Sequence, residues 1–117
     1  MLEPIVAPEE YWQAVHEGML EVVHGQRGTA KALAAGIEYQ MAGKTGTAQV
    51  IGIAQGAVYK ESEVSERHRH HGLFIAFAPV EEPTIAVAII VENGGGSSAA
   101  SPIARAVIDT WLLGEAG

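Results

Sequence analysis

Residues 41–50, Met-Ala-Gly-Lys-Thr-Gly-Thr-Ala-Gln-Val, have the composition of a β-strand and carry one lysine and two threonines. Side chains alternate between the two faces of a strand, so Lys44 and Gly46 are expected on one face. Thr45 and Thr47 are expected on the other face. Gly46 leaves space for the backbone of a ligand. An ammonium group, two hydroxyls and free backbone N–H groups together favour an anion, so the stretch predicts a site for a peptide-like ligand with a carboxylate.

Gly43-Lys44-Thr45 also matches the end of a phosphate-binding P-loop. That motif requires a glycine five residues before Gly43 and a helix directly after the threonine. Position 38 is Glu38, and residues 47–51 have strand composition. The P-loop interpretation is therefore discarded. The remaining alternative to a ligand site is that Lys44 is a solvated strand residue among small neighbours.

Two apolar runs follow the first strand, which we expect over residues 39–53. They span residues 72–79 and 84–92, and the prolines at 79 and 83 interrupt the chain between them. The short connection favours an antiparallel pair. The second run is almost continuously apolar, which predicts a strand covered on both faces.

A helix is expected on each side of these strands. Apolar residues recur at helical spacing from Glu9 to about His24, after Pro8 and before Gly25, which can cap the helix. His24 is expected to interact with the helix dipole when it is protonated. Residues 26–36 are compatible with a short helical turn or with a loop.

The second helix is expected to run from Ser101, as N-cap, through Pro102 to Gly114. Trp12 and Trp111, one on each helix, are expected to be buried against the sheet. The predicted fold class is α/β (α+β), an antiparallel three-stranded sheet flanked by an N-terminal and a C-terminal helix.

Composition narrows the possible functions. The chain has 117 residues, so it forms one domain or part of one. A formal charge of -7 with only seven Lys and Arg residues argues against nucleic acid as a partner. No apolar run approaches the roughly 20 residues of a membrane span, and no signal peptide is recognisable. Because cysteine is absent, the sequence does not indicate a redox compartment.

The run Arg67-His68-Arg69-His70-His71 offers a second candidate site. Alternating His68 and His70 side chains could bind a metal ion such as zinc. No carboxylate spacing completes a tetrahedral set, so we favour a basic, solvent-exposed loop and predict no metal site. Such a loop would change its charge between about pH 5 and pH 8.

Four short motifs together resemble the C-terminal part of the transpeptidase domain of penicillin-binding proteins. They are Gly28-Thr29-Ala30, Lys44-Thr45-Gly46-Thr47-Ala48, Phe77-Ala78-Pro79 and Asn93-Gly94-Gly95. The sequence is most similar to the class B, elongation-type proteins of the penicillin-binding protein 2 group in Gram-negative bacteria. The resemblance runs from about Tyr11 to Leu113 and implies a larger sheet, of five strands, with helices on both faces.

The resemblance implies a peptidoglycan DD-transpeptidase that cross-links the cell wall. In this family a serine in an S-x-x-K motif attacks a D-alanyl-D-alanine peptide bond, or the β-lactam ring that mimics it. Lys44 would supply positive potential and organise the proton network. Thr45 and Thr47 would bind the terminal carboxylate of the substrate across Gly46, and the Thr47 N–H would be one of two oxyanion-hole donors. No cofactor is implied.

The resemblance also implies a setting for the parent protein. It would be membrane-anchored at the periplasmic face of the inner membrane, within a cell-wall elongation complex. Its ligands would be the D-Ala-D-Ala stem peptide of peptidoglycan and β-lactams.

The chain departs from the family pattern in its serines. They lie at positions 62, 65, 97, 98 and 101, and none has a lysine three residues later or completes an S-x-N motif. Residues 1–117 are therefore interpreted as the incomplete C-terminal portion of a transpeptidase domain. Its partner would be the remainder of that domain, and alone it is expected to be inactive and, through an exposed sheet edge, to self-associate. The alternatives are a fragment of a serine β-lactamase or β-lactam sensor, and a noncatalytic binding module.

Overall fold

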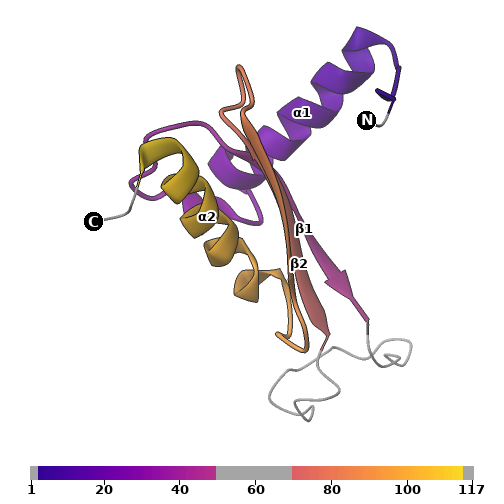
Figure 1. Ribbon diagram of the computed structural model, residues 1–117. Coiled ribbons are helices and arrows are strands. Elements are labelled where there is room, and N and C mark those ends of the chain that lie inside the picture. The colour runs from indigo at the N-terminus through magenta and orange to yellow at the C-terminus, as the bar shows by residue number, and fades with distance from the viewer. Residues whose placement is uncertain (1–2, 50–69, 115–117) are drawn as a thin grey trace.

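The computed structural model describes residues 3–49 and 70–114, and its elements follow the expected order of helix, strands and helix (Figure 1). The elements are α1 (Glu9–His24), η1 (Lys31–Ala34), β1 (Ala42–Ala48), β2 (His71–Ala78), β3 (Ile85–Val91), η4 (Ser97–Ala99) and α2 (Ser101–Leu113). The helices η1 and η4 are short 3-10 turns. The segment between α1 and β1 thus contains the helical turn that the sequence left open.

The three strands of the described residues form one antiparallel sheet in the order β1-β2-β3. This confirms the predicted fold class. β1 begins at Ala42, three residues later than expected, because the preceding residues make other contacts. The carbonyl of Gln40 accepts a hydrogen bond from the N–H of Val80, and the N–H of Met41 donates to the His24 side chain. The expected strand residues 50–53 lie outside the described residues.

The core lies between the sheet, α2, the C-terminal end of α1 and the segment that leads into β1. Phe74, Ala76 and Ala78 of β2 are buried on the face where Ala104 and Ile108 of α2 pack. Alternate residues of a strand share a face, which explains this spacing on β2. The small alanines let the helix approach the sheet closely, so α2 fixes the position of the central strand.

β3 is less covered than its composition predicted. Its residues alternate between half-buried and exposed, and Ile90 is 64% exposed. The half-buried residues, Ile85, Val87, Ile89 and Val91, pack against the core. The prediction of a strand covered on both faces is wrong for this chain, because among the described residues β3 is the last strand and only α2 packs on it.

The first helix is buried only near its C-terminal end. Pro8 is the N-cap and Glu9 and Glu10 form the first turn, as expected. Figure 1 shows the N-terminal half of α1 extending beyond the sheet. Tyr11 and Val15 are accordingly 63% and 56% exposed, whereas Val23 is fully buried. The apolar stripe is therefore fully buried only in its last turn, at Val23.

The two tryptophans do not pack as predicted. Trp12 is half-buried beside the ring of His16, at 6.0 Å between ring centroids, and His16 in turn lies 5.0 Å from the Phe77 ring. Trp111 is 63% exposed, so its predicted burial is wrong. It lies near the end of α2 beside Ile85 of β3, where no other strand of the described residues covers it.

The second helix begins one residue earlier than expected. Ser101 is the first helical residue, Ala100 is the N-cap and Pro102 follows in the first turn. The turn η4 leads directly into the helix, so the boundary is displaced. Neither helix of the described residues combines the length and apolar character that a bilayer span requires.

Candidate functional site

The sequence Lys44-Thr45-Gly46-Thr47 lies on an edge strand. Within the described residues β1 pairs only with β2, so its other edge has no strand partner. Lys44 and Thr47 are exposed, and Thr45 and Gly46 are half-buried. Along an edge strand, the N–H and C=O groups of alternate residues point outward. An extended peptide can add to such an edge as a further strand.

Lys44 carries a positive charge at this edge. Its Nζ donates a hydrogen bond to the carbonyl of Thr45 at 2.7 Å. No carboxylate of the described residues forms an ion pair with it. Lys44 is paired across the sheet with Ile75, whose side chain is 49% exposed on the face away from α2. The ammonium group is therefore accessible to an anion.

The two threonines lie on the opposite face from Lys44, as the strand alternation predicted. Thr45 pairs with Phe74 and Thr47 pairs with Gly72, both of which are buried on the α2 side. The hydroxyl oxygens of Thr45 and Thr29 are 3.2 Å apart. Thr29 belongs to the Gly28-Thr29-Ala30 motif, but no sequence rule predicts its contact with Thr45, which lies 16 positions later.

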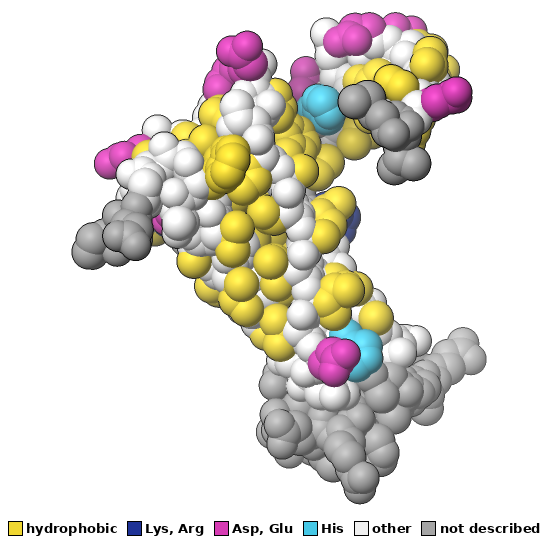
Figure 2. All heavy atoms as spheres, viewed as in Figure 1, with side chains coloured by type: hydrophobic (Ala, Val, Ile, Leu, Met, Phe, Trp, Pro, Cys, Tyr) yellow, Lys and Arg dark blue, Asp and Glu magenta, His cyan; other side chains and the backbone are white. Residues whose placement is uncertain are grey.

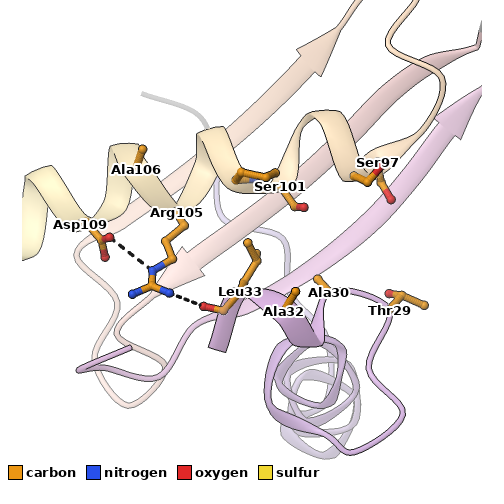
Figure 3. A pocket seen from close by; sticks show the side chains of 11 residues that line it. Thr29, Ala30, Ala32, Leu33, Ser97, Ser101, Arg105, Ala106 and Asp109 are labelled. Atoms are coloured by element: carbon orange, nitrogen blue, oxygen red, sulfur yellow. Dashed lines mark hydrogen bonds and ion pairs between the residues drawn. The ribbon is translucent and has the colours of Figure 1, made fainter. Parts of the chain in front are cut away.

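A cavity of about 510 Å³ opens next to Thr29, between η1 and the start of α2 (Figure 3). Its lining includes hydroxyl groups of Ser97 and Ser101 at one end and the Arg105 and Asp109 side chains at the other. These residues were absent from the predicted site. The Arg105–Asp109 spacing of four residues was the available signal, because charged residues at this spacing meet on one helix face.

Packing against β2 restricts the residue that precedes Lys44. A Cβ atom at Gly43 would lie 2.6 Å from Cζ of Phe74 and 2.9 Å from the carbonyl oxygen of Ile75. Both distances are shorter than van der Waals contact. Only glycine therefore allows β1 to lie this close to β2 before the Lys44 position.

The start of β1 is attached to the end of α1 through His24. The Met41 N–H donates to Nε2 of His24 at 3.0 Å, and Met41 is fully buried. His24 thus links the last turn of α1 to the start of β1, and its expected interaction with the helix dipole when protonated stays a prediction.

The described part of the histidine run is not a solvent-exposed loop. His70 is 2% exposed, and its carbonyl accepts a hydrogen bond from the N–H of Gly95. His71 belongs to β2, and its Nδ1 accepts from the N–H of Asn93 at 2.9 Å. The exposed-loop prediction is wrong for these two residues, because the turn after β3 packs on them. Residues 67–69 lie outside the described residues.

No metal centre is evident in the part of the chain that the structure describes. There, no three His, Cys, Asp or Glu side chains lie close enough to hold an ion. His68 lies outside that part, so the metal hypothesis for the His68 and His70 pair is not addressed by this geometry.

Tyr39 forms a hydrogen-bonded network with Asp109 and Arg105, two of the residues that line the cavity. The Tyr39 hydroxyl donates to Oδ1 of Asp109 at 2.6 Å, and Nε of Arg105 donates to Oδ2 of the same carboxylate at 3.3 Å. Burial raises the pKa of Tyr39 well above its ordinary value, and the hydrogen bond to Asp109 and its negative charge raise it further. The positive charge of Arg105 acts in the opposite direction. Tyr39 therefore remains a hydrogen-bond donor at alkaline pH.

The raised pKa of Tyr39 predicts that the free energy of unfolding falls as the pH rises in the alkaline range. An unfolded tyrosine loses its proton near pH 10, whereas folded Tyr39 retains it. The contribution of Tyr39 to the free energy of unfolding is thus complete below about pH 10 and declines as the pH rises further. In urea unfolding measured from pH 9 to pH 12, the free energy of unfolding should fall more steeply with pH for the wild type than for Tyr39→Phe. Tyr11→Phe, at an exposed tyrosine, should follow the wild type, and parallel curves for Tyr39→Phe would contradict the assignment.

Comparison with known proteins gives consistent matches. The penicillin binding protein transpeptidase domain family matches residues 3–109. The chain is 48% identical over 105 residues to the peptidoglycan D,D-transpeptidase MrdA of Acinetobacter baumannii, covering 90% of this chain and 15% of that protein. Among solved structures, PBP2 of Pseudomonas aeruginosa in complex with WCK 5153 has a TM-score of 0.77 at 42% identity, covering 100% of this chain and 23% of that one.

A second solved structure agrees with these matches. PBP2 of Helicobacter pylori in complex with MreC has a TM-score of 0.70 at 33% identity, covering 90% of this chain and 18% of that one. The chain thus spans about 15% of the A. baumannii relative and 23% of the P. aeruginosa structure. The family match extends over most of the chain, and the chain belongs to the penicillin-binding protein transpeptidase family.

Proposed function

We propose that this chain supplies the substrate-binding edge of a peptidoglycan DD-transpeptidase. The observation that carries the proposal is the position of Lys44-Thr45-Gly46-Thr47 on the free edge of β1, with the Lys44 ammonium unpaired by any carboxylate of the described residues. The name of the A. baumannii relative, a peptidoglycan D,D-transpeptidase, supports the same reaction class. The substrate would be a stem peptide ending in D-Ala-D-Ala.

In this proposal the substrate peptide lies along β1 as an additional strand. Its terminal carboxylate accepts hydrogen bonds from the hydroxyls of Thr45 and Thr47, and Lys44 provides positive potential. The absence of a side chain at Gly46 leaves room for the peptide. The N–H of Thr47 donates to the oxyanion that forms when the acyl carbonyl is attacked. The pairing of β1 with β2 holds these groups on one extended strand before the reaction.

The nucleophile would come from outside residues 1–117. None of the serines has the S-x-x-K context of the family nucleophile, so we propose that these residues form an incomplete C-terminal portion of a transpeptidase domain. The attacking serine, its lysine and the S-x-N motif belong to the remainder of the domain. The chain alone is then inactive.

The β3 side of the sheet is the proposed contact for that remainder. A groove of about 530 Å³ runs between β3 and α2, and Ile103, Val107 and Trp111 along it are 45%, 41% and 63% exposed. Figure 2 shows hydrophobic side chains gathered in a band over the α2 side of the sheet. Burial of such a band against the missing strands and helices would stabilise the complete domain. Without them, the same edge would favour self-association.

The setting of the parent protein follows from the proposed reaction. Its substrate is cell-wall peptide, so the enzyme would act at the periplasmic face of the inner membrane. The family name, penicillin binding protein transpeptidase domain, supports β-lactams as ligands of the proposed site. The H. pylori PBP2 structure contains MreC, which supports a cell-wall elongation complex as the assembly of the parent protein.

Labelling with a fluorescent penicillin tests the proposal. We expect no covalent adduct on the purified chain and a stoichiometric adduct on the complete domain that contains it, at a serine outside residues 1–117. An adduct on the chain alone would overturn the incomplete-domain interpretation. A complete domain that forms no adduct would overturn the transpeptidase assignment.

A further inference from the structure

One arginine of α2 holds the segment that leads into β1. Nη1 of Arg105 donates to the carbonyl of Leu33 at 2.8 Å and also to the carbonyl of Ala35. Both carbonyls lie at the end of η1, where a 3-10 turn leaves acceptors without partners in the turn itself. Figure 3 shows Arg105 reaching from α2 across the cavity to Leu33. The contact joins residues that are 72 positions apart in sequence.

Asp109 fixes the orientation of this arginine and adds a second attachment. Its Oδ2 accepts from Nε of Arg105, one helical turn earlier, and its Oδ1 accepts from the Tyr39 hydroxyl. A guanidinium group is charged at every accessible pH and has a rigid planar set of donors. The Arg105–Asp109 ion pair on α2 therefore makes three hydrogen bonds to the segment 33–39. Arg105 donates two of them, and Asp109 accepts the third from Tyr39.

Only two residues separate the segment 33–39 from the start of β1 at Ala42. After Tyr39, the carbonyl of Gln40 accepts a hydrogen bond from the Val80 N–H and the Met41 N–H donates to the His24 side chain. The strand then begins at Ala42. Because β1 is paired only with β2 among the described residues, no second strand fixes its outer edge. A shift of the segment before β1 would therefore displace the Lys44 position directly.

We propose that Arg105 and Asp109 are positioning residues for the edge of β1, an inference that rests on the proposed function of that edge. They act through the backbone of residues 33–39 and do not contact the substrate. The ion pair sets where the Lys44-Thr47 edge lies relative to the part of the domain that carries the nucleophile. Small misplacements of this kind have large effects on rates, since about 1 Å can cost 100-fold.

Hydrogen–deuterium exchange on the complete domain tests this inference without relying on activity. Arg105→Gln is compared with Arg27→Gln, which removes an exposed arginine near the end of α1. We expect Arg105→Gln to accelerate exchange about tenfold or more across residues 35–48 and to leave the pairing of β2 with β3 unchanged. Arg27→Gln should match the wild type. Equal acceleration in all elements would mean that Arg105 contributes only to overall stability, and would overturn the proposal.

Acylation by a fluorescent penicillin provides the second readout. The rate constant for acylation of the folded Arg105→Gln domain is expected to fall about 10- to 100-fold. Asp109→Asn is expected to cause a slightly smaller fall. Arg105→Lys keeps the charge but loses the planar donor set, so its acylation rate should lie between those of Arg105→Gln and the wild type. It replaces Arg105→Gln as the test variant if Arg105→Gln does not fold. An unchanged rate in the folded variants would overturn the proposal. A wild-type domain that is never acylated would refute the proposed function, while the exchange pattern would still decide whether Arg105 fixes β1.

Discussion

Replacing Lys44 with alanine is expected to lower the rate constant for acylation of the complete domain by a fluorescent penicillin about 100- to 1000-fold. The loss is large because a fixed charge beside the reacting groups stabilises the transition state without reorganisation of solvent. Lys44 is exposed and its ammonium is paired with no carboxylate of the described residues. Within those residues it donates a hydrogen bond to the neighbouring Thr45 carbonyl. Its removal should therefore leave the melting temperature nearly unchanged.

Lys31→Ala is the matched control for this experiment. Lys31 is also exposed, but it lies on η1 rather than on β1. Its replacement removes the same charge from the chain and should leave the acylation rate within about twofold of the wild type, because an exposed charge that is not on the β1 edge is screened by water and salt. If the two variants are acylated equally fast, Lys44 has no role at the proposed site.

The strand that carries Lys44 illustrates what sequence can predict. Alternation of side chains depends only on backbone geometry, so the opposite orientations of Lys44 and Thr45 follow from their adjacency. The antiparallel pairing of β2 with β3 likewise follows from the short connection between these two strands. Local rules of this kind determined the elements, their order and the fold class correctly.

Burial was harder to predict where it depends on a neighbour outside the local pattern. β3 has the composition of a covered strand, and Trp111 lies at helical spacing from buried Ile108, yet Ile90 and Trp111 are both exposed. Hydrophobic pattern indicates that a residue can be buried, but it does not identify the element that covers it. In the proposed complete domain, that element lies outside this chain.

Polar contacts over long sequence distances were missed for a related reason. The hydrogen bond from Met41 to His24 joins residues 17 positions apart, and the bond from Tyr39 to Asp109 joins residues 70 positions apart. No spacing rule connects such pairs, because tertiary packing alone brings them together. Only the spacing of Arg105 and Asp109 on one helix face was accessible to sequence reasoning.

Gly72→Ala is expected to destabilise the protein by about 3 kcal/mol, a large part of the stability of a small domain. A Cβ atom at Gly72 would lie 2.0 Å from the carbonyl oxygen of Gly96 and 2.7 Å from its carbonyl carbon. These are backbone atoms that cannot rotate away. The turn is also tied to β2, since the Gly95 N–H donates to the His70 carbonyl and the Asn93 N–H donates to His71. The added methyl group must therefore break these contacts or displace β2.

Gly18→Ala provides the control, because a Cβ atom there would meet nothing within 4 Å. Gly18 lies within α1, where alanine is the better helix former, so this variant should stabilise the protein by about 0.5–1 kcal/mol. Urea unfolding of both variants measures the difference directly. Gly72 also pairs with Thr47 across the sheet, so the same substitution should displace the proposed oxyanion donor and slow acylation of the protein that remains folded. If Gly72→Ala had the same urea midpoint as the wild type, the close contact between β2 and the turn after β3 would not be essential to the fold. The position of Thr47 would then not depend on that contact.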